Sequence, residues 1–186
     1  MGQAVVGSAK IGSRPGSGFV CRFDLSQGAP GRRWRAQKNG GAQALGRSRG
    51  GLNTKIHALS SNEDAILRFA LTLGQTHDSV AFDAVYCAVE AFPRAQSLSA
   101  DKAYDSDPIR QKLKKHGHQA VIPLKANRTT EIDFDNDKYK ERNRIERAFR
   151  KLKIFRRIAT RYDKLAKVFE AFICVAASIL IAKINR

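Results

Sequence analysis

The sequence is short of negative charge. Lys and Arg outnumber Asp and Glu by 34 to 17 in a chain of 186 residues, which gives a formal net charge of +17 at pH 7. Residues 1–53 contain a single acidic residue, Asp24. So large a positive excess on a small protein favours a polyanionic partner over a merely solvated basic surface. Nucleic acid is therefore the expected partner.

Cysteine is also scarce, and long hydrophobic runs are lacking. Cys21, Cys87 and Cys174 are isolated, so no paired spacing predicts a zinc site or a disulfide framework. The longest apolar run, residues 171–182, is shorter than the roughly 20 residues of a membrane-spanning helix, and we expect a buried helix there. Residues 1–18 lack an apolar stretch of signal-peptide type. We therefore expect a cytoplasmic protein with reduced thiols and no membrane partner.

The order of the expected elements is that of an α/β domain. Residues 1–53 are rich in Gly, Ser and Arg, so a compact domain is expected to begin near Leu52. Alternating apolar residues after it predict a β-hairpin. Strands that then alternate with helices predict a mixed sheet flanked by helices. The expected elements are hairpin strands at 54–58 and 66–73, a helix from Asp78 to Pro93, a strand at 96–100, a helix from Asp107 to Gly117, a strand at 119–124, and helices over 138–185 with a break near Thr160.

Four polar residues share one stripe of a predicted helix. Tyr139, Arg142, Glu146 and Lys153 lie at offsets that fall within an arc of roughly 60° at the helical pitch. An adjoining apolar stripe would seat this helix on the sheet and hold Glu146 at the edge of the core. An ordinary amphipathic helix with a charged shoulder would show the same pattern, and for the stripe taken alone that interpretation is favoured. The apolar stripe consists of Ile145, Ala148, Phe149 and Leu152.

The four residues also carry a resemblance to a known family. Tyr139-x2-Arg142-x3-Glu146-x6-Lys153 is similar, without gaps, to the YREK signature of DDE-type transposases of bacterial insertion sequences. Residues 46–57, 100–105 and 155–164 resemble further segments of that family, in the same order. The resemblance covers roughly residues 38–182. It implies an α/β, ribonuclease-H-like fold in which a mixed sheet is flanked by helices.

The resemblance implies metal-dependent DNA cleavage and strand transfer. In-line attack on a phosphodiester is served by two Mg²⁺ or Mn²⁺ ions about 4 Å apart, and such hard cations take carboxylate ligands. In the family the Glu of the signature is the third metal-binding carboxylate, which corresponds to Glu146, and the second Asp corresponds to Asp101. Asp105 is a nearby competitor for this role. It ranks lower because it lies beyond the strand end, where Asp is common as a turn residue.

The expected polymer partner is double-stranded DNA, both the ends of the insertion sequence and the target. Arg142 and Lys153 would clamp phosphates, and Tyr139 would stack on a nucleotide or bond to it. An alternative is that Arg142 pairs with Glu146 as a structural bridge, and Lys153 has the same alternative. A homo-oligomer assembled on DNA is compatible with this role. Further expected DNA contacts are Arg47, Arg49, Arg156 and Arg157.

The first third of the chain departs from the family pattern. Asp24 is the single candidate for the first catalytic Asp and metal ligand, but Gly28, Pro30 and Gly31 follow where a strand should continue. We therefore expect an irregular basic segment over residues 1–37, which a truncation or frameshift near residue 35 would explain, and a catalytic domain over 38–186. The alternatives to a competent transposase are an inactive DNA-binding remnant, or a nuclease of the same fold that cuts without joining. We expect the chain to be poorly active.

Overall fold

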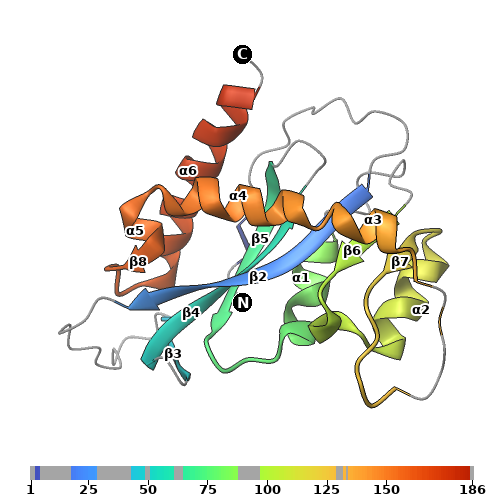
Figure 1. Cartoon of the computed structure of the whole chain (residues 1–186). Helices are drawn as coiled ribbons and strands as arrows, with labels where there is room; N and C mark the ends of the chain where they lie inside the picture. Colours follow the sequence, from blue (N-terminus) through green and yellow to red (C-terminus); the bar gives the residue numbers. More distant parts are fainter. Residues whose placement is uncertain are drawn as a thin grey trace.

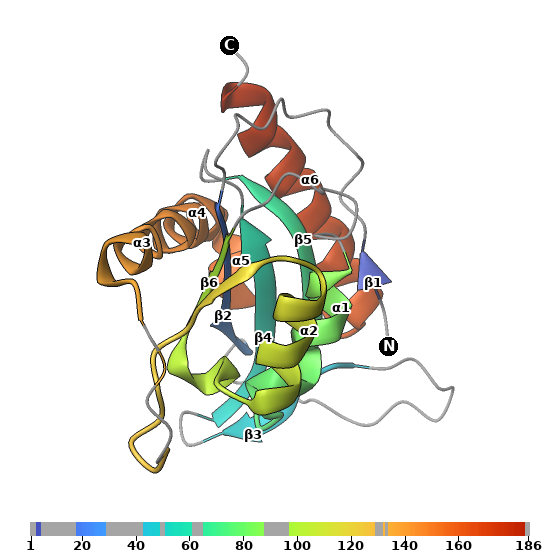
Figure 2. The same cartoon turned by 90° about the vertical axis from the view of Figure 1, so that its right-hand side faces the viewer.

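The computed structural model is built around one mixed β-sheet with helices on both faces (Figure 1). For residues 3–4 and 18–28 it describes the backbone. In Figure 2, α3 and α4 lie on one side of the sheet, and α1 and α2 lie on the other. This arrangement confirms the predicted fold class. The residues that the structure describes are 3–4, 18–28, 43–48, 51–60, 65–87, 97–128, 132 and 134–184.

The predicted β-hairpin forms one half of the sheet. The strands β4 (Gly51–Ser60) and β5 (Ile66–Leu73) pair in antiparallel fashion, with Ile56 opposite Leu71. Ile56 and Ala58 are fully buried, as their alternation with Lys55 predicts. Two short strands extend this half: β3 (Gly46–Ser48) pairs with β4, and β1 (Gln3–Ala4) pairs with β5.

The centre of the sheet is β2 (Gly18–Gly28), and it corrects the sequence-based expectation. The expectation of an irregular segment over residues 1–37 is wrong for these eleven residues. The strand pairs with β4 on one side, antiparallel, and with β6 on the other, parallel. Gly28 is its last residue, so Pro30 and Gly31 follow the strand and do not interrupt it. Pairing with β4 and β6 stabilises a strand that its own composition does not predict.

The other half of the sheet is parallel. The strand β6 (Ser97–Ala100) runs parallel to β2, and β7 (Gln119–Val121) runs parallel to β6. Both strands were predicted from the sequence. The two-residue strand β8 (Thr160–Arg161) pairs with the end of β2 and lies where a break in the C-terminal helices was expected. The order across the sheet is β1-β5-β4-β2-β6-β7.

One face of the sheet is covered by short helices. They are η1 (Asp78–Ala81), α1 (Phe82–Tyr86), η3 (Lys102–Tyr104) and α2 (Asp107–Lys115). Their apolar side chains form a core cluster with Leu59, Leu98 and Ala100 of the sheet. The helix α2 ends before Gly117, as predicted, where φ is +75° and glycine has no steric penalty. The helix expected up to Pro93 ends at Tyr86, and residues 88–96 lie outside the described part of the chain.

The other face carries the remaining helices, which are α3 (Asn136–Lys140), α4 (Asn143–Lys153), α5 (Arg156–Ala159) and α6 (Ala166–Ile184). The single helix predicted through Tyr139 and Lys153 is divided between α3 and α4. The backbone N–H of Arg142 donates to Tyr139 and that of Arg144 to Glu141, a tighter i→i−3 pattern that separates the two helices. Among the described helices, none is long and apolar enough to cross a membrane.

Candidate carboxylate site

Asp101 lies at the carboxyl end of β6, in the turn that leads into η3. The preceding residue, Ala100, is fully buried, whereas the Asp101 side chain is 20% exposed. The backbone N–H of Tyr104 donates to the Asp101 carbonyl at 2.9 Å and closes the turn. The buried strand end and the closed turn therefore hold a partly exposed carboxylate, at the strand end where the sequence predicts it.

Glu146 lies in the first turn of α4, the helix that begins directly after Arg142. The neighbouring Ile145 is fully buried against the sheet, in a cluster with Ile56 of β4. The Glu146 side chain is 28% exposed. The apolar stripe predicted for this helix is buried in full, so packing of α4 fixes where Glu146 stands relative to the sheet.

A single guanidinium joins the two carboxylates. Arg142 Nη1 lies 2.8 Å from Asp101 Oδ1, and Arg142 Nη2 lies 2.9 Å from Glu146 Oε1. Since the two terminal nitrogens of one guanidinium are about 2.3 Å apart, the two carboxylate oxygens lie within about 8 Å of each other. Asp101 and Glu146 are 45 positions apart in the sequence. The fold thus brings them together, and the pairing of Arg142 with Glu146, which the sequence left as an alternative, is present.

The environment of Arg142 is strongly anionic. Burial acts to lower the pKa of its guanidinium, but the hydrogen bond and charge of Asp101, together with Tyr139 and Glu146, raise that pKa above its ordinary value. Its Cζ also lies 5.4 Å from the centre of the Tyr139 ring, which in turn lies 5.2 Å from the ring of Phe134. Tyr139 and Arg142 therefore lie beside the carboxylates, although the helix break separates them from α4.

The other residues expected to bind DNA are spread more widely. Lys153 is the last residue of α4 and is half-buried. Arg47 on β3 and Arg156 on α5 are exposed. Arg157 contacts Asp163 at 2.6 Å and lies over the ring of Phe172, so its charge is partly used within the fold. Arg49 lies outside the described residues.

Asp24 occupies a position on β2 opposite Ile56 of β4. The parallel pairing with β6 aligns Cys21 with Ala100, so Asp24 lies three residues further along β2, beyond the last residue of β6 that pairs with it. The side chain of Asp24 lies outside what the structure describes. Among the residues whose side chains are described, no group of three or more His, Cys, Asp or Glu residues is placed to hold a metal ion.

Asp105, the competitor of Asp101, has a structural role. Its side chain is 1% exposed and contacts Arg110 at 2.8 Å, Arg128 at 3.0 Å and the backbone N–H of Lys125 at 2.9 Å. Burial acts to raise the pKa of Asp105, but the Lys125 hydrogen bond and the two arginines outweigh it and lower that pKa below its ordinary value. This carboxylate is already neutralised by protein groups, which supports the preference for Asp101.

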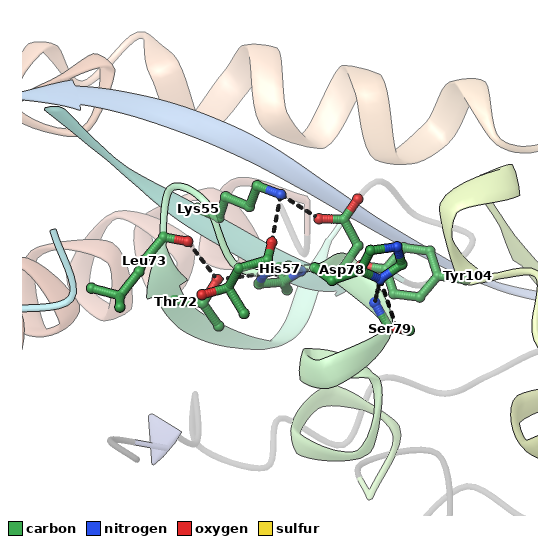
Figure 3. A network of polar contacts seen from close by, with 9 residues as sticks. Lys55, His57, Thr72, Leu73, Asp78, Ser79 and Tyr104 are labelled. Atoms are coloured by element: carbon green, nitrogen blue, oxygen red, sulfur yellow. Dashed lines mark hydrogen bonds and ion pairs between the residues drawn. The ribbon is translucent and has the colours of Figure 1, made fainter. Parts of the chain in front are cut away.

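A buried histidine that the sequence pattern does not mark contacts Tyr104, in the turn after Asp101; Figure 3 shows His57 and Tyr104 within a network of polar contacts. His57 of β4 is fully buried, with Nδ1 at 3.1 Å from the Tyr104 hydroxyl and Nε2 at 2.8 Å from the Thr72 hydroxyl. In neutral His57 one ring nitrogen donates and the other accepts, so the ring links the hydroxyls of Thr72 and Tyr104. The alternation places His57 on the same face of the strand as Lys55, opposite to Ile56 and Ala58, so the sequence pattern gave no signal that His57 would be buried.

His57 is held in its neutral form. Burial, followed by the positive charge of Lys55, lowers the pKa of His57 to about 4 from 6.5. Lys55 itself contacts Asp78 at 2.8 Å and the carbonyl of Thr76 at 2.7 Å (Figure 3). Protonation of His57 would leave its ring without an acceptor nitrogen and would place an uncompensated charge in the core.

We predict an acid-dependent loss of stability that originates at His57. The unfolded chain takes up a proton near pH 6.5 and the folded chain near pH 4, so this contribution is present above pH 6.5 and is lost as pH falls toward 4. The expected loss is on the order of 3 kcal/mol. Urea unfolding at pH 7, 5.5 and 4 measures it. His57→Gln should be less stable at pH 7 but lose less on acidification; equal losses in the two proteins would contradict the prediction.

In sequence, the chain is similar to known transposases. Residues 26–181 match the family described as transposase DDE domain. A putative transposase for the insertion sequence element IS6501 of Brucella ovis is 30% identical over 131 residues. That match covers 69% of this chain and 98% of the Brucella protein. The family match includes Asp101, Arg142 and Glu146.

Two solved structures also show a likeness. The piggyBac transposase synaptic complex with hairpin DNA has a TM-score of 0.49 at 12% identity, over 92% of this chain and 48% of that chain. A pre-cleavage Mos1 transpososome has a TM-score of 0.36 at 10% identity, over 92% of this chain and 56% of that chain. This chain therefore spans about half the length of the chains in those two structures.

Proposed function

Because this chain belongs to the family of transposase DDE domains, with a ribonuclease-H-like fold, we propose that it cleaves DNA strands and joins them to a target in a metal-dependent reaction. The observation that carries the proposal is the convergence of Asp101 and Glu146 on one cationic group. The two carboxylates come from a strand end and a packed helix, and both remain open to solvent. A pair of anions held in this way is suited to a divalent cation.

The residues present fit Mg²⁺ or Mn²⁺. The donor set consists of carboxylate oxygens, which hard cations prefer, and the Arg142 guanidinium already occupies the space between them as a positive charge. When bound, two such ions would activate the attacking oxygen and stabilise the negative charge on the leaving oxygen. Asp101 and Glu146 would hold them. The fold keeps these carboxylates in place. The turn after β6 is closed by the hydrogen bond from Tyr104 to the Asp101 carbonyl, and α4 is held by its buried apolar stripe.

We propose Asp24 as the third carboxylate. It stands on the central strand, opposite Ile56, which packs in the same core cluster as Ile145 of α4. Residues that pair across neighbouring strands occupy the same face of a sheet, so the position of Asp24 belongs to the α4 face, where Glu146 is found. The catalytic domain would then include β2. The boundary near residue 38 would exclude this strand, so the domain is proposed to begin before it.

DNA would lie along the basic side of α4. Arg142, Lys153 and Tyr139 are proposed to hold the strand near the scissile phosphate, and exposed arginines such as Arg47 and Arg156 would add contacts along the duplex backbone. The net charge of +17 favours such binding and predicts that it weakens with salt. Assembly of several copies on DNA is compatible with this role.

The test is a strand-transfer assay with the full chain. A labelled duplex that carries the ends of the parent element is incubated with a target plasmid and Mn²⁺, with EDTA as the control. Nicked donor together with labelled target is the expected result. Nicked donor without labelled target would favour a nuclease that cuts but does not join. Binding of the duplex without any nicking would favour the inactive remnant and contradict the proposal.

A further inference from the structure

Arg142 lies between the two carboxylates that are proposed to bind a divalent cation. Its two terminal nitrogens contact one oxygen of Asp101 and one of Glu146, at 2.8 and 2.9 Å. A Mg²⁺ ion binds carboxylate oxygens at about 2.0 to 2.1 Å. An ion that bound both oxygens at that distance would hold them within about 4.2 Å of each other, which leaves no room for a guanidinium between them. The contacts of Arg142 and those of a metal are therefore alternatives at these two atoms.

We propose that Arg142 is an exchangeable counter-cation. Its guanidinium holds Asp101 and Glu146 together before metal binds and then moves to contact a DNA phosphate. The inference rests on the proposed metal-dependent function. A planar guanidinium binds carboxylate and phosphate with the same two-pronged geometry, so one side chain can serve both partners. Its side chain is 26% exposed, which leaves a path toward solvent and DNA.

The position of Arg142 in the chain suits such an exchange. It lies at the junction of α3 and α4, where the hydrogen bonds change to the i→i−3 pattern, and not in the rigid middle of a helix. The neighbouring ring of Tyr139 contacts the guanidinium at 5.4 Å from its centre. This ring can stay in contact with the cation while the two nitrogens change partners, because a cation–π contact depends little on which hydrogen bonds are made.

Exchange couples the two ligands of the site. Metal binding displaces Arg142 and so makes it available to DNA, and DNA that takes Arg142 removes a competitor of the metal. By linkage, each ligand then increases the affinity for the other by the same factor. A protein built in this way would hold its carboxylates ordered but neutralised until both metal and DNA arrive.

The experiment measures Mn²⁺ binding to the folded chain by calorimetry, with and without a short duplex. Arg142→Gln removes the competitor and is expected to bind Mn²⁺ about five- to tenfold more tightly than the unchanged protein when DNA is absent. Arg144→Gln is the matched control: it removes one positive charge two residues further along the chain, from a side chain of the same 26% exposure that contacts Glu141 instead. It is expected to change Mn²⁺ affinity little.

The second arm measures duplex affinity by fluorescence anisotropy at fixed ionic strength. Mn²⁺ should increase the duplex affinity of the unchanged protein and of Arg144→Gln more than that of Arg142→Gln, because only the first two have an Arg142 guanidinium that the metal can release to DNA. Screening of DNA by Mn²⁺ is common to all three proteins and does not produce this difference. If Arg142→Gln binds Mn²⁺ no more tightly than Arg144→Gln, the exchange is wrong while the metal site stands. If none of the proteins binds Mn²⁺, the exchange and the proposed metal-dependent function are both wrong.

Discussion

Asp101→Asn is expected to reduce Mn²⁺-dependent strand cleavage by about a thousandfold or more, and Glu146→Gln by a similar factor. The physical reason is the loss of an anionic ligand: metal-ion stabilisation of the transition state is worth several kcal/mol, and each 1.4 kcal/mol corresponds to about tenfold in rate. The same loss is expected for Asp24→Asn if its position on β2 supplies the third ligand. Initial rates of nicking on a labelled duplex measure the effect.

The control for this prediction is Asp137→Asn on α3. It makes the same chemical change at a side chain that is 88% exposed and pairs with Lys140, so cleavage should stay within about twofold of the unchanged protein. Thermal unfolding should show that Asp101→Asn and Glu146→Gln remain folded, because both carboxylates are part of a solvent-accessible ion-pair group. Undiminished cleavage by either variant would remove that residue from the proposed metal site.

Asp105→Asn is expected to destabilise the fold by about 3 kcal/mol, the largest loss of stability that we predict for a carboxylate in this chain. The substitution keeps the shape of the side chain but removes the negative charge that two arginines share. Arg110 and Arg128 are only 12% and 16% exposed, so water cannot compensate them well. The hydrogen bond that Asp105 accepts from the Lys125 backbone also loses its ionic character. Urea unfolding at pH 7 measures the free energy.

Asp107→Asn provides the comparison. Asp107 also contacts Arg128, but its side chain is 69% exposed, so the expected loss is below about 1 kcal/mol. The two substitutions separate a buried from a solvated partner of the same arginine. If Asp105→Asn lowered the free energy of unfolding as little as Asp107→Asn, the Asp105 carboxylate would not be needed to stabilise the fold. Asp105 would then again be a competitor of Asp101 for the metal.

Elements with a strong local pattern were predictable from the sequence. The hairpin of β4 and β5 follows from period-two alternation around Ile56, and α2 from Pro108 at its start and Gly117 after its end. The buried stripe of α4 follows from the helical period. In each case the signal lies within a few residues of sequence, so the chain carries it without reference to distant segments.

The central strand was not predictable in this way. The composition of residues 1–53 is that of an irregular segment, and Gly28, Pro30 and Gly31 argued against a strand near Asp24. What stabilises β2 is pairing with β4 on one side and β6 on the other, and those partners are distant in the sequence. Strand formation at the centre of a sheet depends on such neighbours more than on propensity.

By itself, the sequence determined which residues are candidates for the chemistry, because the four-residue signature and the Asp101 segment are patterns of identity and spacing. Only the tertiary structure decided how the carboxylates differ. Asp101 and Asp105 are four positions apart, yet Asp105 is enclosed by two arginines and Asp101 meets Glu146 through Arg142 at the surface. Charge neutralisation depends on which side chains lie within a few ångströms, and only folding brings Arg128 to Asp105 and Arg142 to Asp101.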